Sequence, residues 1–131
     1  MTERPLSPHL SVYRMYRYTL LSSILNRAAG LVLSVGLILL VYWLVAIAGG
    51  PAAYRGAREV LSLNPLKAVY VLLLAAFSYH FFAGIRHLIW DSGHGLERAQ
   101  ARRSARLLAV ASVLLFVGLT WWALHAVART P

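Results

Sequence analysis

Three long apolar runs constrain the fold of this chain more than any other feature of its sequence. Residues 28–48, 68–85 and 107–128 contain 21, 18 and 22 residues, and none of them is Asp, Glu, Lys or Arg. An α-helix of about 20 apolar residues crosses the hydrocarbon core of a bilayer. Only 13% of the chain is charged, against about 25% in a typical soluble domain. The sequence therefore predicts an all-α membrane protein with three transmembrane helices.

The predicted helices extend beyond the apolar runs at their polar ends. We expect transmembrane helices at about residues 19–48, 65–91 and 105–128. Residues 1–18 then form a cytoplasmic N-terminal segment, and residues 1–131 form a single membrane-anchor domain. The first run is too long for the apolar region of a cleaved signal peptide, which has about 7–15 residues. Three helices enclose little volume, so their polar side chains predict partner subunits in a hetero-oligomeric helical bundle.

The distribution of positive charge predicts the orientation of the chain. Nine of its 13 Lys and Arg residues precede the first run or lie between the second and third runs, while four lie in the remaining segments. Cytoplasmic segments of membrane proteins are enriched in Lys and Arg. The N-terminus is therefore expected in the cytoplasm and the C-terminus on the opposite side. This explanation of the net charge of +9 requires no nucleic-acid partner.

His80 is an ionisable residue inside the second apolar run. It lies about six residues, or ~9 Å along a helix, inside the cytoplasmic end of that run. Ionisable residues at such a depth face protein or a cavity and are candidates for function. A chain without cysteine can hold a redox cofactor through a neutral imidazole bound to haem iron. The alternative is a structural histidine whose ring forms a hydrogen bond with a neighbouring helix.

Three residues that follow His80 bear on this choice. Gly84 lies on the same helical face, where the absence of a side chain would admit a flat macrocycle; ordinary packing of small residues between helices is the alternative. His87 lies two turns after His80 at the membrane boundary, where it is either exposed to water or near haem propionates. Arg86 is interpreted as a solvated charge at the end of the helix.

A polar stripe occupies one face of the first predicted helix. It consists of residues spaced by four, three and four positions: Ser23, Arg27, Gly30 and Ser34. Ser23 and Arg27 form a donor pair that suits the carbonyl oxygen of a quinone, and the guanidinium would stabilise negative charge as that oxygen is reduced. Alternatively, Arg27 extends to a lipid phosphate. Contacts with membrane lipid headgroups are also expected of Arg102, Arg103 and Arg106.

Three segments together resemble the large cytochrome b membrane-anchor subunit of succinate dehydrogenase, respiratory complex II. They are RPLSPHLSVYR (residues 4–14), SSILNRAAG (22–30) and SYHFFAGIRHLIWDSGHG (78–95). They occur in the order expected for that family and, with the three apolar runs, cover nearly the whole chain. The pattern H-x-x-x-G-I-R-H-L-x-W-D-x-G is highly specific, and RPLSPHL is a second, independent marker.

The resemblance implies a haem b and a ubiquinone site. His80 would be one axial ligand of the haem iron, and a histidine of a second, smaller anchor subunit would be the other. Arg27 and His87 would lie near the haem propionates. Ser23 and Arg27 would help to form the ubiquinone site beside an iron–sulphur subunit. Many family members carry histidine where this chain has Asn26, which does not titrate near neutral pH.

The resemblance also implies a place in a larger oxidoreductase complex. A flavoprotein subunit would oxidise succinate, as in the tricarboxylic acid cycle, and electrons would pass through the iron–sulphur subunit to ubiquinone. This chain would carry no catalytic residue for succinate. We expect a multi-pass protein of the bacterial inner membrane rather than the mitochondrial one. Two alternatives remain compatible with the sequence, namely a haem-free structural anchor that binds quinone and the anchor of a fumarate reductase.

Overall fold

The computed structural model describes residues 17–128, which form four α-helices joined by short connections. They are α1 (Arg17–Ala48), α2 (Gly50–Leu61), α3 (Asn64–Asp91) and α4 (Arg98–Ala128). No strand occurs within this part of the chain, so the prediction of an all-α protein is confirmed for it. Most of the predicted cytoplasmic segment, including the motif at residues 4–14, lies outside the described residues.

Three of these helices are long and apolar enough to cross a membrane. The candidate spans are Tyr18–Ala48, Asn64–Asp91 and Arg98–Ala126, with 31, 28 and 29 residues. At the α-helical rise they are about 42–47 Å long, which exceeds the ~30 Å hydrocarbon core of a bilayer. Their outer surfaces carry large apolar side chains, and Leu31 and Leu114 are 70% and 67% exposed. Such surfaces belong against lipid or partner helices, and the predicted three membrane-crossing helices are confirmed.

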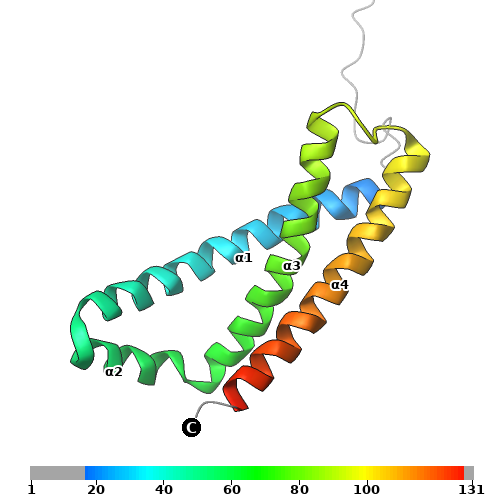
Figure 1. Ribbon diagram of the computed structural model, residues 1–131. Helices are drawn as coiled ribbons and strands as arrows, with labels where there is room; N and C mark the ends of the chain where they lie inside the picture. Colours follow the sequence, from blue (N-terminus) through cyan, green and yellow to red (C-terminus); the bar gives the residue numbers. More distant parts are fainter. Residues whose placement is uncertain (1–16, 129–131) are drawn as a thin grey trace, which may run out of the picture.

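The connection between α1 and α3 contains the short helix α2. Gly50 has a φ of +87°, in the left-handed region that glycine adopts without strain, and Pro51 follows in the first turn of α2. The chain thereby reverses after α1, and α2 runs back towards the start of α3 (Figure 1). The hydroxyl of Tyr70 donates a hydrogen bond to the carbonyl oxygen of Leu61 at 2.8 Å. This bond ties the end of α2 to α3.

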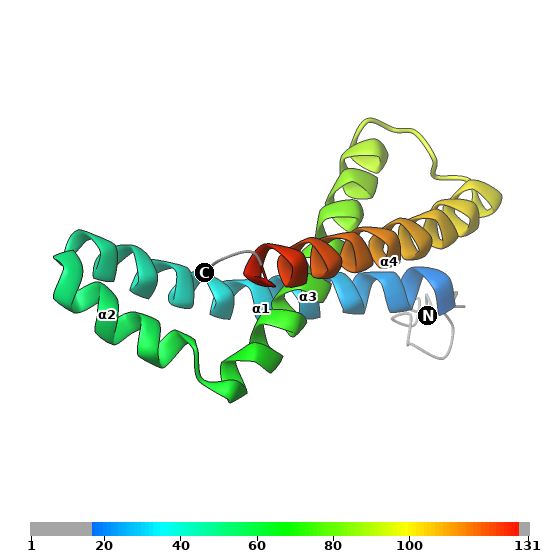
Figure 2. The ribbon, with the colours of Figure 1, turned by 60° about the horizontal axis from the view of Figure 1, so that its bottom comes forward.

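The helix α3 lies in the middle of the fold, with α1 crossing it and α4 packed along it (Figure 1). α1 and α4 begin at the same end of the molecule, whereas the last turns of α1 diverge towards α2 (Figure 2). The shared end contains residues 17–27 of α1, the last turns of α3 and residues 98–106 of α4. We call it the arginine-rich end, because most of the arginines of the described chain gather there.

Small residues make the contacts between the helices. Among the described residues, the buried hydrophobic side chains are Leu108 and six alanines: Ala29, Ala46, Ala57, Ala76, Ala83 and Ala101. A Cβ placed on Gly36 would overlap a methyl group of Leu73, so α1 and α3 approach closely at this point. Lipid chains are as apolar as leucine side chains, so membrane helices gain stability from close packing rather than from apolar burial. The composition of this core is typical of that kind of packing.

Candidate haem and quinone site

His80 lies on α3 where α1 crosses it. Its ring is half-buried, and its Nδ1 atom is 3.3 Å from the carbonyl oxygen of Asn26 on α1. A Cβ on Gly30 would lie 3.4 Å from the Cε1 atom of His80, so the bare backbone of Gly30 forms one wall of the ring's surroundings. Asn26 and Gly30 are one helical turn apart. The crossing of the two helices therefore determines where the His80 ring lies.

The contact with Asn26 favours one tautomer of a neutral His80 ring. A carbonyl oxygen only accepts hydrogen bonds, so Nδ1 is the nitrogen that carries the proton in this contact. In a neutral ring, the other nitrogen, Nε2, then has a free lone pair. Histidines that ligate metals commonly have this arrangement, in which the second ring nitrogen donates to a backbone carbonyl. The contact is thus compatible with both alternatives for His80, a structural histidine and a ligand of haem iron.

The face of α3 beside His80 is open at Gly84. Within residues 17–128, no heavy atom of another helix lies within 4 Å of the position that a Cβ of Gly84 would take. A Cβ at position 84 would therefore meet open space in the described part of the chain. His87 is exposed, with its ring centroid 5.6 Å from that of Trp90 in an edge-on arrangement. Gly84 and His87 are both accessible to a group from outside the chain.

The four residues of the polar stripe of α1 have different surroundings in the structure. Gly30 faces His80, whereas Ser34 is exposed and its hydroxyl donates to the carbonyl oxygen of Gly30 at 2.9 Å. Ser23 is half-buried, and Arg27 is exposed one turn later. The α1 residues that contact the His80 ring are Asn26 and Gly30. Ser23 lies about one turn before Asn26, and Arg27 directly follows Asn26 at an exposed position.

Asn26 also carries an unsatisfied polar atom. Its side-chain oxygen is buried and has no hydrogen-bond partner in the described structure. A buried amide without a partner is costly, and such groups are normally satisfied by protein, water or a ligand. The amide can present either its oxygen or its NH₂ group to a partner, because the two orientations have nearly the same shape. The crossing of α1 and α3 therefore holds a polar atom whose hydrogen-bonding capacity is unused in the described structure.

Arg86 joins all three long helices at the arginine-rich end. It is only 6% exposed. Its guanidinium donates to the hydroxyls of Ser22 on α1 at 2.9 Å and Ser104 on α4 at 3.0 Å. It also donates to the carbonyl oxygen of Ala101 at 2.9 Å and lies 3.9 Å from the centre of the Trp90 ring. The interpretation of Arg86 as a solvated charge is therefore wrong.

The sequence contained part of the information about Arg86. Trp90 lies four residues after it, the spacing at which a cation and an aromatic ring meet on one helical face. The partners Ser22 and Ser104 come from helices whose rotation about their own axes the sequence does not specify. Tyr79 adds a further contact at this junction, because its hydroxyl donates to the carbonyl oxygen of Ser22 at 3.2 Å. Ser22 is thus held by two side chains of α3.

Metal binding by this chain alone has no support in the described structure. No group of three or more His, Asp or Glu side chains that could hold a metal ion occurs among residues 17–128. A haem iron has different requirements, since the porphyrin supplies four ligands and the protein supplies one or two axial ones. A single half-buried histidine with one free ring nitrogen fits an axial position. The residues present are therefore compatible with haem.

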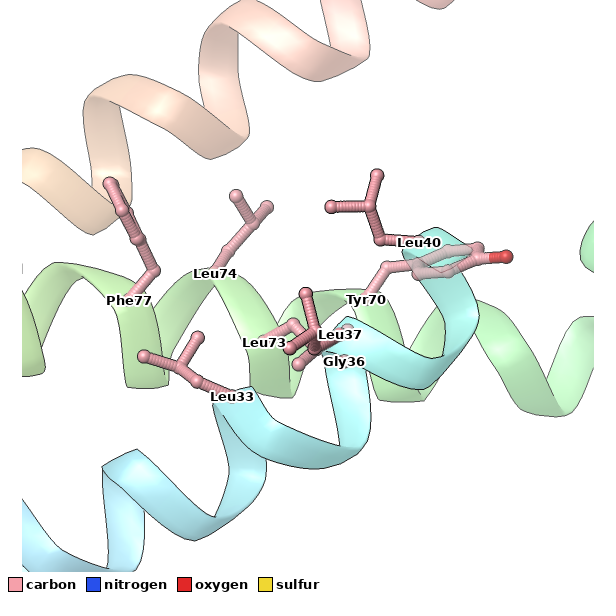
Figure 3. A pocket seen from close by; sticks show the side chains of 8 residues that line it. All are labelled: Leu33, Gly36, Leu37, Leu40, Tyr70, Leu73, Leu74 and Phe77. Atoms are coloured by element: carbon pink, nitrogen blue, oxygen red, sulfur yellow. The ribbon is translucent and has the colours of Figure 1, made fainter. Parts of the chain in front are cut away.

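An apolar groove lies between α1 and α3 on the side of the crossing nearer α2. It has a volume of about 490 Å³ and is lined by Leu33, Gly36, Leu37, Leu40, Tyr70, Leu73, Leu74 and Phe77 (Figure 3). The hydroxyl of Tyr70 is the polar side-chain group among these residues, and it already donates to Leu61. The groove offers no acid, base or nucleophile. It suits an apolar chain or a partner helix rather than chemistry.

Comparisons with known proteins agree with the motifs. Residues 1–127 match the family described as succinate dehydrogenase/fumarate reductase transmembrane subunit. The chain is 40% identical over 114 residues to the succinate dehydrogenase cytochrome b556 subunit of Paracoccus denitrificans, covering 87% of each chain. It is 34% identical over 121 residues to the mitochondrial cytochrome b560 subunit of Sus scrofa, covering 90% of this chain and 70% of the relative.

A third relative extends the match to nearly full length on both sides. The cytochrome b556 subunit of succinate dehydrogenase from Rickettsia conorii is 34% identical over 122 residues, which cover 91% of each chain. Three membrane-crossing helices, as described above, fit a transmembrane subunit. The chain therefore belongs to the succinate dehydrogenase/fumarate reductase transmembrane subunit family, as a membrane protein related to succinate dehydrogenase cytochrome b subunits.

Proposed function

We propose that this chain is a cytochrome b membrane-anchor subunit of succinate dehydrogenase, in which His80 is one axial ligand of a haem b. The observation that carries the proposal is the half-buried His80 ring, whose Nδ1 lies 3.3 Å from the Asn26 carbonyl oxygen. This contact leaves Nε2 available for iron. The relatives are named cytochrome b556 and b560 subunits, which supports a haem of this type.

The surroundings of His80 suit a haem shared with a second chain. Gly84 leaves the neighbouring face of α3 open, and the side-chain oxygen of Asn26 is buried without a partner. When bound, the haem would carry single electrons. His80 would hold and orient the iron, and Arg27 and His87 would lie near the propionates, where a guanidinium and an imidazole stabilise carboxylates. The opposite axial ligand would be a histidine of a second, smaller anchor subunit.

The same end of α1 is proposed to bind ubiquinone. Ser23 and Arg27 are one turn apart, and the exposed guanidinium of Arg27 remains free to meet a quinone or a partner subunit. A hydroxyl and a guanidinium would donate to one quinone carbonyl oxygen and stabilise the charge that develops during reduction. Electrons would come from succinate through the flavoprotein and iron–sulphur subunits. This chain would contribute binding and charge stabilisation rather than the oxidation of succinate.

The proposed location follows from charge and from the bacterial relatives. The arginine-rich end would face the cytoplasm of a bacterial cell, with the protein in the inner membrane, because Lys and Arg are enriched on that side. The iron–sulphur subunit would then dock at this end. The exposed apolar surfaces of the long helices would meet the smaller anchor subunit and membrane lipid.

Spectra of the purified wild-type complex test the cofactor. We expect a b-type reduced-minus-oxidised spectrum with a shift of the Soret band, and haem b in equal amount to this chain. The same spectrum distinguishes a haem-binding anchor from a haem-free anchor, because a haem-free anchor would show no Soret shift. A complex that reduces quinone without any haem signal would establish the haem-free alternative.

Replacing Arg27 tests the quinone site. In Arg27→Ala, we expect succinate–quinone reductase activity to fall roughly ten- to hundred-fold, the loss that follows removal of one hydrogen bond from a charged donor. Oxidation of succinate by an artificial dye should persist, because that reaction does not pass through the quinone site. Arg103→Ala is the matched control, since Arg103 is exposed on α4 at the same end of the molecule. Unchanged quinone reduction in Arg27→Ala would leave Arg27 as a lipid contact.

A further inference from the structure

A hollow of about 460 Å³ lies between α1 and α4 at the arginine-rich end. The two helices are neighbours at this end and diverge as they run away from it (Figure 1). The walls include Leu21 and Leu25 of α1 and Leu108 of α4, while Tyr18, Arg102 and Arg106 also line it. We call it the α1–α4 hollow. It is separate from the His80 contact, which lies between α1 and α3.

The polarity of the α1–α4 hollow changes along its length. Arg102 lies in the charged start of α4, and the uncharged run 107–128 begins directly after Arg106. Tyr18 lies at the start of α1, and Leu25 lies seven residues later, or ~10 Å along the helix. A smaller hollow of about 400 Å³ shares Tyr18 and Arg102 and extends the space towards Arg98. The space is therefore cationic at the membrane boundary and apolar within the membrane.

The charge of the α1–α4 hollow is uncompensated by the residues that line it. Neither hollow has an acidic lining residue in the described part of the chain. Arg102 and Arg106 are exposed and one helical turn apart, so both guanidinium groups face the same region. Guanidinium groups bind phosphate oxygens in pairs of parallel hydrogen bonds. A neutral ligand such as a quinone would leave this paired charge without a partner.

We infer that the α1–α4 hollow binds one anionic phospholipid. Its phosphate lies between Arg102 and Arg106, and the upper part of an acyl chain lies against Leu21, Leu25 and Leu108. The inference goes beyond the proposed function and does not depend on haem or quinone. Of the three arginines expected to contact lipid, the inference assigns Arg102 and Arg106 to this site. Arg103 lines neither hollow.

The number of retained anionic phospholipids tests the inference. The complex is purified from native membranes in mild detergent, and its anionic phospholipids are extracted and counted per copy of this chain. Each arginine near an anionic surface contributes about 1 kcal/mol, which corresponds to about five-fold in affinity. The variant Arg102→Gln/Arg106→Gln should therefore retain about one anionic phospholipid fewer than wild type. The control Arg103→Gln should retain the wild-type number, and equal retention in all three proteins would overturn the inference.

A second measurement covers the case in which the double variant does not assemble. Wild-type complex is placed in nanodiscs containing phosphatidylglycerol with a photoreactive acyl chain, or phosphatidylcholine with the same chain. Labelling of residues 21–25 and 105–109 by phosphatidylglycerol in clear excess over phosphatidylcholine supports the inference. Equal labelling by both lipids would show a general lipid surface, and labelling by neither would show that another subunit fills the hollow. Either result would overturn the proposal.

Discussion

Replacing His80 with leucine should abolish the b-type haem spectrum of the complex. Leucine cannot ligate iron, and the proposed haem would then keep at most the one axial ligand from the partner subunit. Haem content per complex and the reduced-minus-oxidised spectrum measure this loss directly. Reduction of quinone should fall less than haem content, because the proposed quinone site at Ser23 and Arg27 does not include His80. The two quantities are therefore measured on the same preparations.

Substitution of a histidine on another helix is the control for the general effect of a His→Leu change on the complex. His125 on α4 is exposed, and its Nδ1 lies 2.8 Å from the carbonyl oxygen of Trp121 in its own helix. His125→Leu should leave haem content unchanged. His80→Met guards against loss of assembly, because it keeps a thioether ligand and should retain some haem with a raised reduction potential. A full complement of haem at the wild-type potential in His80→Leu would remove His80 from the proposed role.

The helices of this chain were predictable from sequence because their causes are local. Hydropathy over about 20 residues and the absence of charge determine whether a segment crosses a bilayer. The runs 28–48, 68–85 and 107–128 each satisfy both conditions, and each lies inside a long helix of the structure. The depth of His80 in its helix is a local property of the same kind. Which carbonyl group of α1 the ring contacts is not a local property.

Contacts between helices depend on rotations and crossing points that no single segment determines. The sequence places Ser23, Arg27 and Gly30 on one face of α1, but the structure turns Asn26 and Gly30 towards His80. The two helices also approach closely at Gly36, because a side chain there would meet Leu73. The interpretation of Arg86 as a solvated charge fails for the same reason, since its three hydrogen-bond partners are on α1 and α4. Its burial is a property of the assembled helices.

Arg86→Leu should substantially weaken the packing of the three long helices. Leucine removes three hydrogen bonds from the guanidinium to Ser22, Ser104 and Ala101. A hydrogen bond between membrane helices contributes about 0.6 kcal/mol on average, whereas one from a charged group contributes about 1.5–3 kcal/mol. We therefore expect a loss of about 2–5 kcal/mol, measured as lower thermal stability of the purified complex and lower yield of assembled protein.

The size of this effect is limited because the serines keep local acceptors. Ser22 also donates to the carbonyl oxygen of Thr19, and Ser104 to that of Ala101, both at 3.1 Å. Arg103→Leu removes the same charge from an exposed position and should change stability little. Arg86→Lys should lie between the two, because an ammonium group cannot reproduce the planar fork of a guanidinium. Equal stability of Arg86→Leu and Arg103→Leu would mean that Arg86 does not join the helices, whatever its burial.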